Sequence, residues 1–182
     1  SIYLIGVGPG DAKALSLGLA GSAYQQLTTG TLAGRPPLPD LPMEAKVGRL
    51  VREAITRALL GSAHDCSDGG LGVALAESSI ASGLGIEIDL SVQGVRLDRV
   101  LFAEGGSRIV VSVKADCVGQ WEALLAEQDD LPVIRIGVVA ENTYLQVRVD
   151  QDPCLKLEIE QCRHAYSTAI PRRIDGVGKV GK

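Results

Sequence analysis

Residues 64–71 read His-Asp-Cys-Ser-Asp-Gly-Gly-Leu, which is a polar turn leading directly into an apolar helix. Asp65 and Asp68 offer the hard oxygen ligands that Mg²⁺ prefers, and Ser67 adds a hydroxyl group. The two glycines that follow lack side chains, so their backbone amides can approach a phosphate at the positive end of the helix. A simpler interpretation is that Ser67 or Asp68 only caps the helix. The turn therefore predicts either a magnesium and phosphate site or an ordinary helix start.

The segments on both sides of this turn have helical periodicity. From Met43 to Leu59 the apolar residues recur every three or four positions, which predicts an amphipathic helix that ends at Gly61. Residues 70–82 are dense in Ala and Leu, so we expect a second helix that is buried on most sides. Gly83 is its expected carboxy-terminal cap.

Beyond that cap the spacing of apolar residues changes from about four to two. Ile86, Ile88 and Leu90 alternate with acidic residues, which is typical of a half-buried strand. We expect further strands at residues 108–113, 133–139, 144–149 and 155–159, and helices at residues 117–128 and 160–169. This order predicts an α/β domain of the α+β type, in which helices cover a mixed sheet.

We expect the α/β domain to span residues 43–170, and the segments at the two ends of the chain differ from it. Residues 2–7 form a short apolar strand without a neighbouring strand in the sequence, so we expect the segment from Ile2 to Pro42, which contains this orphan strand, to pack loosely or to pair with a second chain. Residues 28–42 collect Thr, Gly and Pro without apolar periodicity, which predicts a surface linker. Residues 171–182 are rich in Gly, Lys and Arg and predict a disordered tail.

Composition and charge exclude several classes of partner. The 182 residues carry a net charge of −4, with an isoelectric point near 5.2, which gives no positive surface for nucleic acid or an anionic membrane. No apolar run reaches the roughly 18 residues that a membrane-spanning helix needs, so we expect a cytoplasmic protein. The four cysteines include no Cys-x-x-Cys pair, which predicts reduced thiols rather than a zinc site or disulfides.

The turn and the segments that follow it resemble one domain of a known enzyme family. Residues 64–77, followed by Gly-Leu-Gly-Ile-Glu-Ile-Asp-Leu at 83–90, look like the signature of the carboxy-terminal AIR-synthase-type domain of phosphoribosylformylglycinamidine synthases. Residues 101–113 resemble that family's next motif, a glutamate-bearing turn with its following strand, and residues 134–139 resemble the third. Leu-Ala-Gly-Ser-Ala-Tyr at residues 19–24 looks like the segment that joins the family's two domain types.

The resemblance implies a role in purine synthesis. Members of the family are ligases that amidate formylglycinamide ribonucleotide with ATP, and they contain two copies of an amino-terminal and carboxy-terminal domain pair. Residues 104–106 read Glu-Gly-Gly where the first copy has Glu-Ser-Gln, which touches the ribonucleotide, so this chain is similar to the second copy. Residues 1–27 would then be the last strand and junction of a missing amino-terminal domain.

The same resemblance implies a set of site residues. Asp65 would bind Mg²⁺, Ser67 would contact the nucleotide, and Gly69 and Gly70 would face its phosphates, so the implied cofactors are ATP and Mg²⁺. The family's catalytic histidine lies in an amino-terminal domain, so no catalytic residue is assigned here and the chain alone is expected to be inactive. The expected partners are the missing amino-terminal domains, a glutamine amidotransferase that supplies ammonia, and a second copy in a homodimer.

Several alternatives stay open at this point. The chain is alternatively a non-catalytic nucleotide-binding or scaffolding module that kept the fold. His64 is either a base or a hydrogen-bonded structural residue, and Glu104 either faces a ligand or is an ordinary turn carboxylate. Residues 3–11 also resemble the Gly-Pro-Gly opening of tetrapyrrole methyltransferases, but that resemblance stops there.

Overall fold

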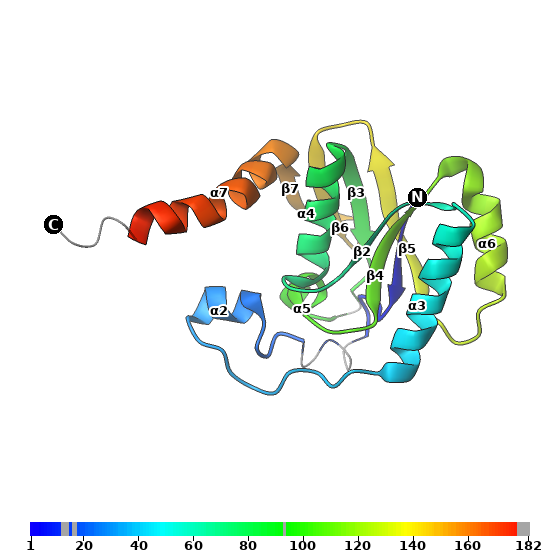
Figure 1. Cartoon of the computed structure of the whole chain (residues 1–182), viewed down its shortest axis with the longest axis horizontal. Coiled ribbons are helices and arrows are strands. Elements are labelled where there is room, and N and C mark those ends of the chain that lie inside the picture. The colour runs from blue at the N-terminus through cyan, green and yellow to red at the C-terminus, as the bar shows by residue number, and fades with distance from the viewer. Residues whose placement is uncertain (12–14, 16–17, 93, 178–182) are drawn as a thin grey trace.

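A computed structural model describes residues 1–11, 15, 18–92 and 94–177 of the chain. Within these residues seven strands form one sheet, in the order β2-β4-β1-β5-β3-β6-β7. β3 and β6 pair in parallel, whereas the other neighbours are antiparallel. Helices lie against this mixed sheet (Figure 1), and the predicted fold class is confirmed.

Most elements agree with the sequence prediction, and α4 agrees at both ends. Gly83 adopts the left-handed conformation of a helix cap after α4, with a φ of 72°. The strands are β1 (Ile2–Gly6), β2 (Leu60–Asp65), β3 (Gly85–Leu90), β4 (Arg108–Val113), β5 (Val133–Ala140), β6 (Tyr144–Val149) and β7 (Asp152–Glu158). The helices are α2 (Ala23–Thr29), α3 (Leu41–Thr56), α4 (Gly70–Ser82), α5 (Leu97–Phe102), the 3₁₀ turn η1 (Ala115–Cys117), α6 (Val118–Ala126) and α7 (Ile159–Val177).

The buried apolar side chains form two cores. The first contains residues of α4 and α5, such as Leu75, and the second contains residues of α3 and α6, such as Trp121. Leu4 of β1 belongs to the first core and its neighbour Ile5 to the second. Because alternate side chains of a strand point to opposite faces, the two cores lie on the two faces of the sheet.

β1 lies in the middle of the sheet, so the expectation of an orphan strand is wrong. It pairs with β4 from Ile2 opposite Ser112 to Gly6 opposite Arg108, and it pairs with β5 on its other edge. All of its residues are buried. Its partners come from the second half of the chain, which is why its neighbours in the sequence gave no sign of them. The strand is thus part of this sheet rather than of a separate domain.

Two boundaries near the turn also differ from the prediction. α3 ends at Thr56, and Ala58 then adopts a left-handed backbone with a φ of 57°. Gly61 does not end this helix but belongs to β2, and His64 and Asp65 are the last residues of that strand. β2 is an edge strand of small, mostly exposed residues without apolar alternation, and it pairs with β4 alone among the described strands.

Segments expected to be irregular contain parts of helices. α2 extends to Thr29, inside the expected linker, and Pro42 lies in the first turn of α3, where its missing N–H would have no partner. α7 continues through Pro171, so residues 171–177 are helical rather than disordered, and residues 178–182 lie outside the described residues. α5 was not predicted. No helix in the described ranges is long and apolar enough to cross a membrane.

Candidate functional site

The turn between β2 and α4 is fixed by backbone contacts. Cys66 is buried, and its N–H donates to the carbonyl oxygen of Arg108 at 3.0 Å. Burial raises the pKa of the Cys66 thiol to about 11, so this thiol is neutral and unreactive at neutral pH. Gly69 is the residue that precedes the first turn of α4, with a φ of 79°, and no side chain caps this helix. The interpretation in which Ser67 or Asp68 caps α4 is therefore wrong.

Asp65 and Ser67 are in direct contact. The Asp65 carboxylate is exposed at the end of β2 and accepts a hydrogen bond from the Ser67 hydroxyl. This bond is the main reason why the pKa of Asp65 lies below its ordinary value; a backbone hydrogen bond and the nearby His64 lower the pKa further, whereas partial burial raises it. Asp65 is therefore ionised at neutral pH, which is the state that binds a metal ion.

The two backbone amides predicted to face a phosphate are already hydrogen-bonded. The N–H of Gly69 donates to Oε1 of Glu104 at 2.7 Å, and that of Gly70 donates to the Ser67 carbonyl oxygen at 3.0 Å. Gly70 also has a packing reason to be glycine, because its φ is 63° and a Cβ atom there would lie 2.6 Å from the Ala103 carbonyl oxygen. The phosphate role of this pair stays a prediction.

Glu104 joins the starts of two helices. Besides the amide of Gly69, its Oε1 atom accepts the N–H of Ala23, the first residue of α2, at 2.9 Å. The backbone N–H of Glu104 donates to the Gly18 carbonyl oxygen at 2.7 Å. In the sequence, the signal was a glutamate followed by two glycines, which does not identify partners that lie 35 and 81 positions away.

Arg108, the first residue of β4, places a buried guanidinium group behind the turn. The residue is 4% exposed and donates to the carbonyl oxygens of Val100 and Ala103 at 3.3 Å each. Its Nε atom has no partner among the described residues, and none of their carboxylates forms an ion pair with it. Burial lowers the pKa of Arg108, but arginine still carries its charge at neutral pH. Sequence reasoning missed this residue, although a basic residue at the first position of an apolar strand indicated that its side chain could be buried.

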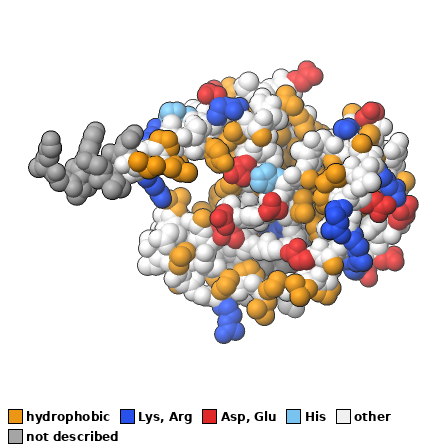
Figure 2. Space-filling view, viewed as in Figure 1, with side chains coloured by type: hydrophobic (Ala, Val, Ile, Leu, Met, Phe, Trp, Pro, Cys, Tyr) orange, Lys and Arg blue, Asp and Glu red, His pale blue; other side chains and the backbone are white. Residues whose placement is uncertain are grey.

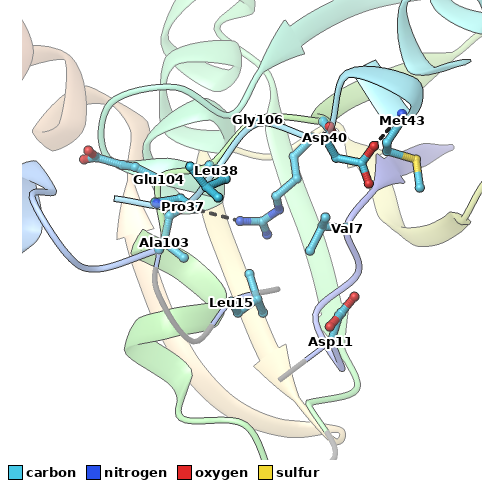
Figure 3. A pocket seen from close by; sticks show the side chains of 14 residues that line it. Val7, Asp11, Leu15, Pro37, Leu38, Asp40, Met43, Ala103, Glu104 and Gly106 are labelled. Carbon is cyan, nitrogen blue, oxygen red and sulfur yellow. Dashed lines mark hydrogen bonds between the residues drawn. The ribbon is translucent and has the colours of Figure 1, made fainter. Parts of the chain in front are cut away.

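Two cavities meet at residues 104–108. The first, of about 420 Å³, holds the predicted site and is lined among others by Glu44, Asp65, Ser67, Asp68, Glu104 and Arg108. The second, of about 350 Å³, shares Glu104 and Arg108 with it. Figure 3 shows the second cavity, with Val7, Leu15 and Leu38 between Glu104 on one side and Asp11 and Asp40 on the other.

The cavity that contains Asp65 is acidic. Four carboxylate side chains of the described residues line it, against one cation, the buried Arg108. On the face seen in Figure 2, acidic side chains gather near the middle of the molecule, while basic ones gather over α3.

Within the described ranges no three His, Cys, Asp or Glu side chains are grouped so as to hold a metal ion. A cation at Asp65 would therefore need further oxygen ligands from outside these residues, such as nucleotide phosphates.

His64 joins β2 to α4 beside this cavity. Its Nε2 atom lies 3.1 Å from a carboxylate oxygen of Glu77 on α4, and its Nδ1 atom lies 2.8 Å from the Asp65 carbonyl oxygen. Both ring nitrogens are engaged with the protein. This geometry favours the structural interpretation of His64 over its role as a base.

With this geometry established, comparison with known proteins identifies the class. The family described as "AIR synthase related protein, C-terminal domain" matches residues 3–150, and the chain belongs to this family. The phosphoribosylformylglycinamidine synthase subunit PurL of Synechococcus sp. (strain CC9902) is 47% identical over 173 residues, which are 95% of this chain and 23% of that protein. The PurL subunit of Parasynechococcus marenigrum (strain WH8102) is 46% identical, over 97% of this chain and 23% of that protein. The resemblance found in the sequence is confirmed, and the chain spans about a quarter of these relatives.

Solved structures agree with the fold. T. maritima PurL complexed with ATP matches with a TM-score of 0.63 and 15% identity, over 89% of this chain and 25% of that chain. A chain of the HypE–HypF complex matches with a TM-score of 0.55 and 19% identity, over 86% of this chain and 51% of that chain. At these identities the likeness concerns the fold alone.

Proposed function

We propose that this chain is the carboxy-terminal AIR-synthase-type domain of the second repeat of a phosphoribosylformylglycinamidine synthase. That enzyme amidates formylglycinamide ribonucleotide with ATP, as a cytoplasmic ligase of purine synthesis. The observation that carries the proposal is the 47% identity to a PurL subunit across 95% of the chain. In this proposal residues 43–170 and β1 form the domain, and residues 30–40, the part of the predicted linker between α2 and α3, are a surface linker within it.

The residues of the turn support a site for a magnesium nucleotide. Asp65 would hold Mg²⁺, Ser67 would contact the nucleotide, and Gly69 and Gly70 would face its phosphates. Mg²⁺ commonly binds one or two carboxylates together with phosphate oxygens and water, which fits the exposed, ionised Asp65 carboxylate beside a hydroxyl group. Bound there, the ion would neutralise phosphate charge inside a cavity rich in carboxylates.

The proposal does not make the chain catalytic by itself. His64 has both ring nitrogens engaged, and His164 contacts Arg172 within α7 at 2.8 Å. We infer that the chemistry needs the amino-terminal domains of the same enzyme and ammonia from a glutamine amidotransferase. A second copy of the chain is a further proposed partner.

A chimera tests this function. The matching region of the Synechococcus sp. (strain CC9902) PurL subunit is replaced by this chain, and ATP-dependent amidation of formylglycinamide ribonucleotide is measured with ammonium as the nitrogen source. We expect turnover by the chimera and none by the 182-residue chain alone. A chimera that carries Cys154→Ser, a substitution at an exposed position, controls for a loss of turnover caused by preparing any substituted protein. A chimera that folds but does not turn over, or turnover by the chain alone, would contradict the proposal.

The alternative, a non-catalytic nucleotide-binding or scaffolding module, is favoured by one observation. The amides of Gly69 and Gly70 already have partners within the chain. A scaffolding role predicts that the chimera keeps its full activity and its nucleotide affinity when Asp65→Asn and Ser67→Ala are combined. Loss of Mg-nucleotide binding in that double variant would exclude scaffolding alone.

A further inference from the structure

A carboxylate of the chain occupies the position at the start of α4 where an anionic ligand would be stabilised. Oε1 of Glu104 lies 2.7 Å from the Gly69 nitrogen and 2.9 Å from the Ala23 nitrogen. The amino-terminal end of a helix attracts anions because its first N–H groups lack partners within the helix. A phosphate that reached the Gly69 amide would therefore compete with Glu104 for it.

A second, independent feature of the same cavity points to an anionic ligand. Arg108 lines the cavity, is 4% exposed and leaves its Nε atom without a partner among the described residues. Glu104 lines the cavity as well but makes no ion pair with Arg108. A buried cation without an ionic partner is costly, and a phosphate in the cavity would lower that cost in a way that Glu104 does not.

The other hydrogen bond of Glu104 holds a weakly attached helix. α2 has seven residues, none of them buried, and Leu27 on it is 83% exposed. Its other hydrogen bonds among the described residues are local, such as the cap by Ser22 and the Ala33 N–H that Gln25 accepts at 2.9 Å, and Tyr24 stacks on Phe102 with ring centroids 4.7 Å apart. Helices this short are marginal without tertiary contacts, so loss of the Glu104 contact would loosen α2.

We propose that Glu104 occupies the phosphate position at the start of α4 until a phosphate-bearing ligand displaces it, and that this displacement releases α2. The inference rests on the proposed function of the turn as a phosphate site. Its consequence is that occupancy of the site is coupled to the order of α2 through one side chain. Because the cavity is rich in carboxylates, the ligand is a phosphate accompanied by Mg²⁺.

Hydrogen exchange on the 182-residue chain, with inorganic phosphate and Mg²⁺ as the probe, tests the coupling. Four proteins are compared: wild type, Glu104→Ala, Glu104→Gln and Glu44→Gln. Glu44→Gln is the matched control, because Glu44 lines the same cavity but does not hydrogen-bond to either amide within the described residues. Glu104→Gln keeps an acceptor oxygen for both amides, so it tests charge without removing the contact. Melting temperatures measured without the probe report whether each variant folds.

In the wild type and in Glu44→Gln, we expect phosphate with Mg²⁺ to speed exchange of the α2 amides. In Glu104→Ala these amides should exchange fast from the start, the probe should add nothing, and phosphate should bind on the order of tenfold more tightly. In Glu104→Gln, without the probe, the α2 amides should exchange at the wild-type rate, and phosphate should bind more tightly than in Glu44→Gln.

Slow α2 exchange in a phosphate-bound wild type, or weaker phosphate binding in both Glu104 variants, would overturn the inference. So would undetectable phosphate binding in all four proteins. This readout does not depend on amidation, so it fails separately from the chimera assay.

Discussion

The Nε2 atom of His64 lies 3.1 Å from a carboxylate oxygen of Glu77, and this contact joins the edge strand β2 to α4 beside the candidate site. Both side chains are 32% exposed. Exposed pairs of this kind contribute roughly 0.2–1 kcal/mol, so His64→Ala should lower the free energy of unfolding by about that amount. Urea denaturation measures the change. His164→Ala is the control, because His164 contacts Arg172 in the same helix, and an equal loss in both variants would remove the structural role of His64.

Asp65→Asn should weaken Mg-nucleotide binding by the chimera, whereas the melting temperature of the isolated domain should fall only slightly, because the exposed Asp65 carboxylate loses little more than its bond with Ser67. The reason is that Asn keeps the size of the side chain but removes the charge that a metal ion requires, and no side chain caps α4 in the structure. The two measurements are the nucleotide dissociation constant with Mg²⁺ and the melting temperature without ligand. Asp116→Asn, a charge removal on η1, controls for net charge. Unchanged affinity would remove Asp65 from the site.

Ser67→Ala should raise the pKa of Asp65 toward its ordinary value, because the Ser67 hydroxyl is the main cause of the lowered pKa. A carboxylate with a lowered pKa in the folded state contributes stability above its ordinary pKa. That contribution is lost as the pH falls through the lowered pKa. In Ser67→Ala the pKa of Asp65 is closer to its ordinary value, so the stability contributed by Asp65 should be smaller and should be lost at a higher pH than in the wild type. An NMR titration of the Asp65 carboxyl group between about pH 2 and 6 measures the shift. Ser78→Ala, whose hydroxyl group bonds to Ala74, should leave the titration unchanged.

Gly70→Ala should destabilise the domain by about 1–3 kcal/mol, because the left-handed backbone and the close Ala103 carbonyl oxygen leave no room for a Cβ atom. Gly119→Ala is the matched variant on α6, where a Cβ atom would meet nothing within 4 Å. It should stabilise the domain by about 0.4–1 kcal/mol. Chemical denaturation of the two proteins gives both values, and a stable Gly70→Ala protein would show that packing does not require this glycine.

The parts of the structure that could be predicted from sequence depend on local signals. α4 was predicted at both ends, since its apolar content and the glycine at position 83 act within the segment itself. Asp65 and Ser67 are two positions apart, so their proximity follows from the sequence. These are also the residues that the family resemblance singled out.

The parts that could not be predicted depend on partners far along the chain. β2 has no apolar alternation, so its strand conformation is visible only once β4 is beside it. The role of Glu104 requires α2 and α4 to begin next to each other, and no spacing within residues 101–113 encodes that arrangement. The buried Arg108 is similar, because its acceptors are carbonyl oxygens at the end of α5 and just after it, whose position is set by packing.

The central position of β1 also has a consequence for synthesis on the ribosome. β1 pairs with β5, which ends at Ala140, so the strand leaves the ribosome long before both of its neighbours exist. At about 5–20 residues per second, the wait is on the order of ten seconds. β4, which ends at Val113, can pair with one edge of β1 earlier, but the other edge of β1 stays unpaired until β5 exists. The growing chain must therefore keep this segment from aggregating until residues 133–140 have been made.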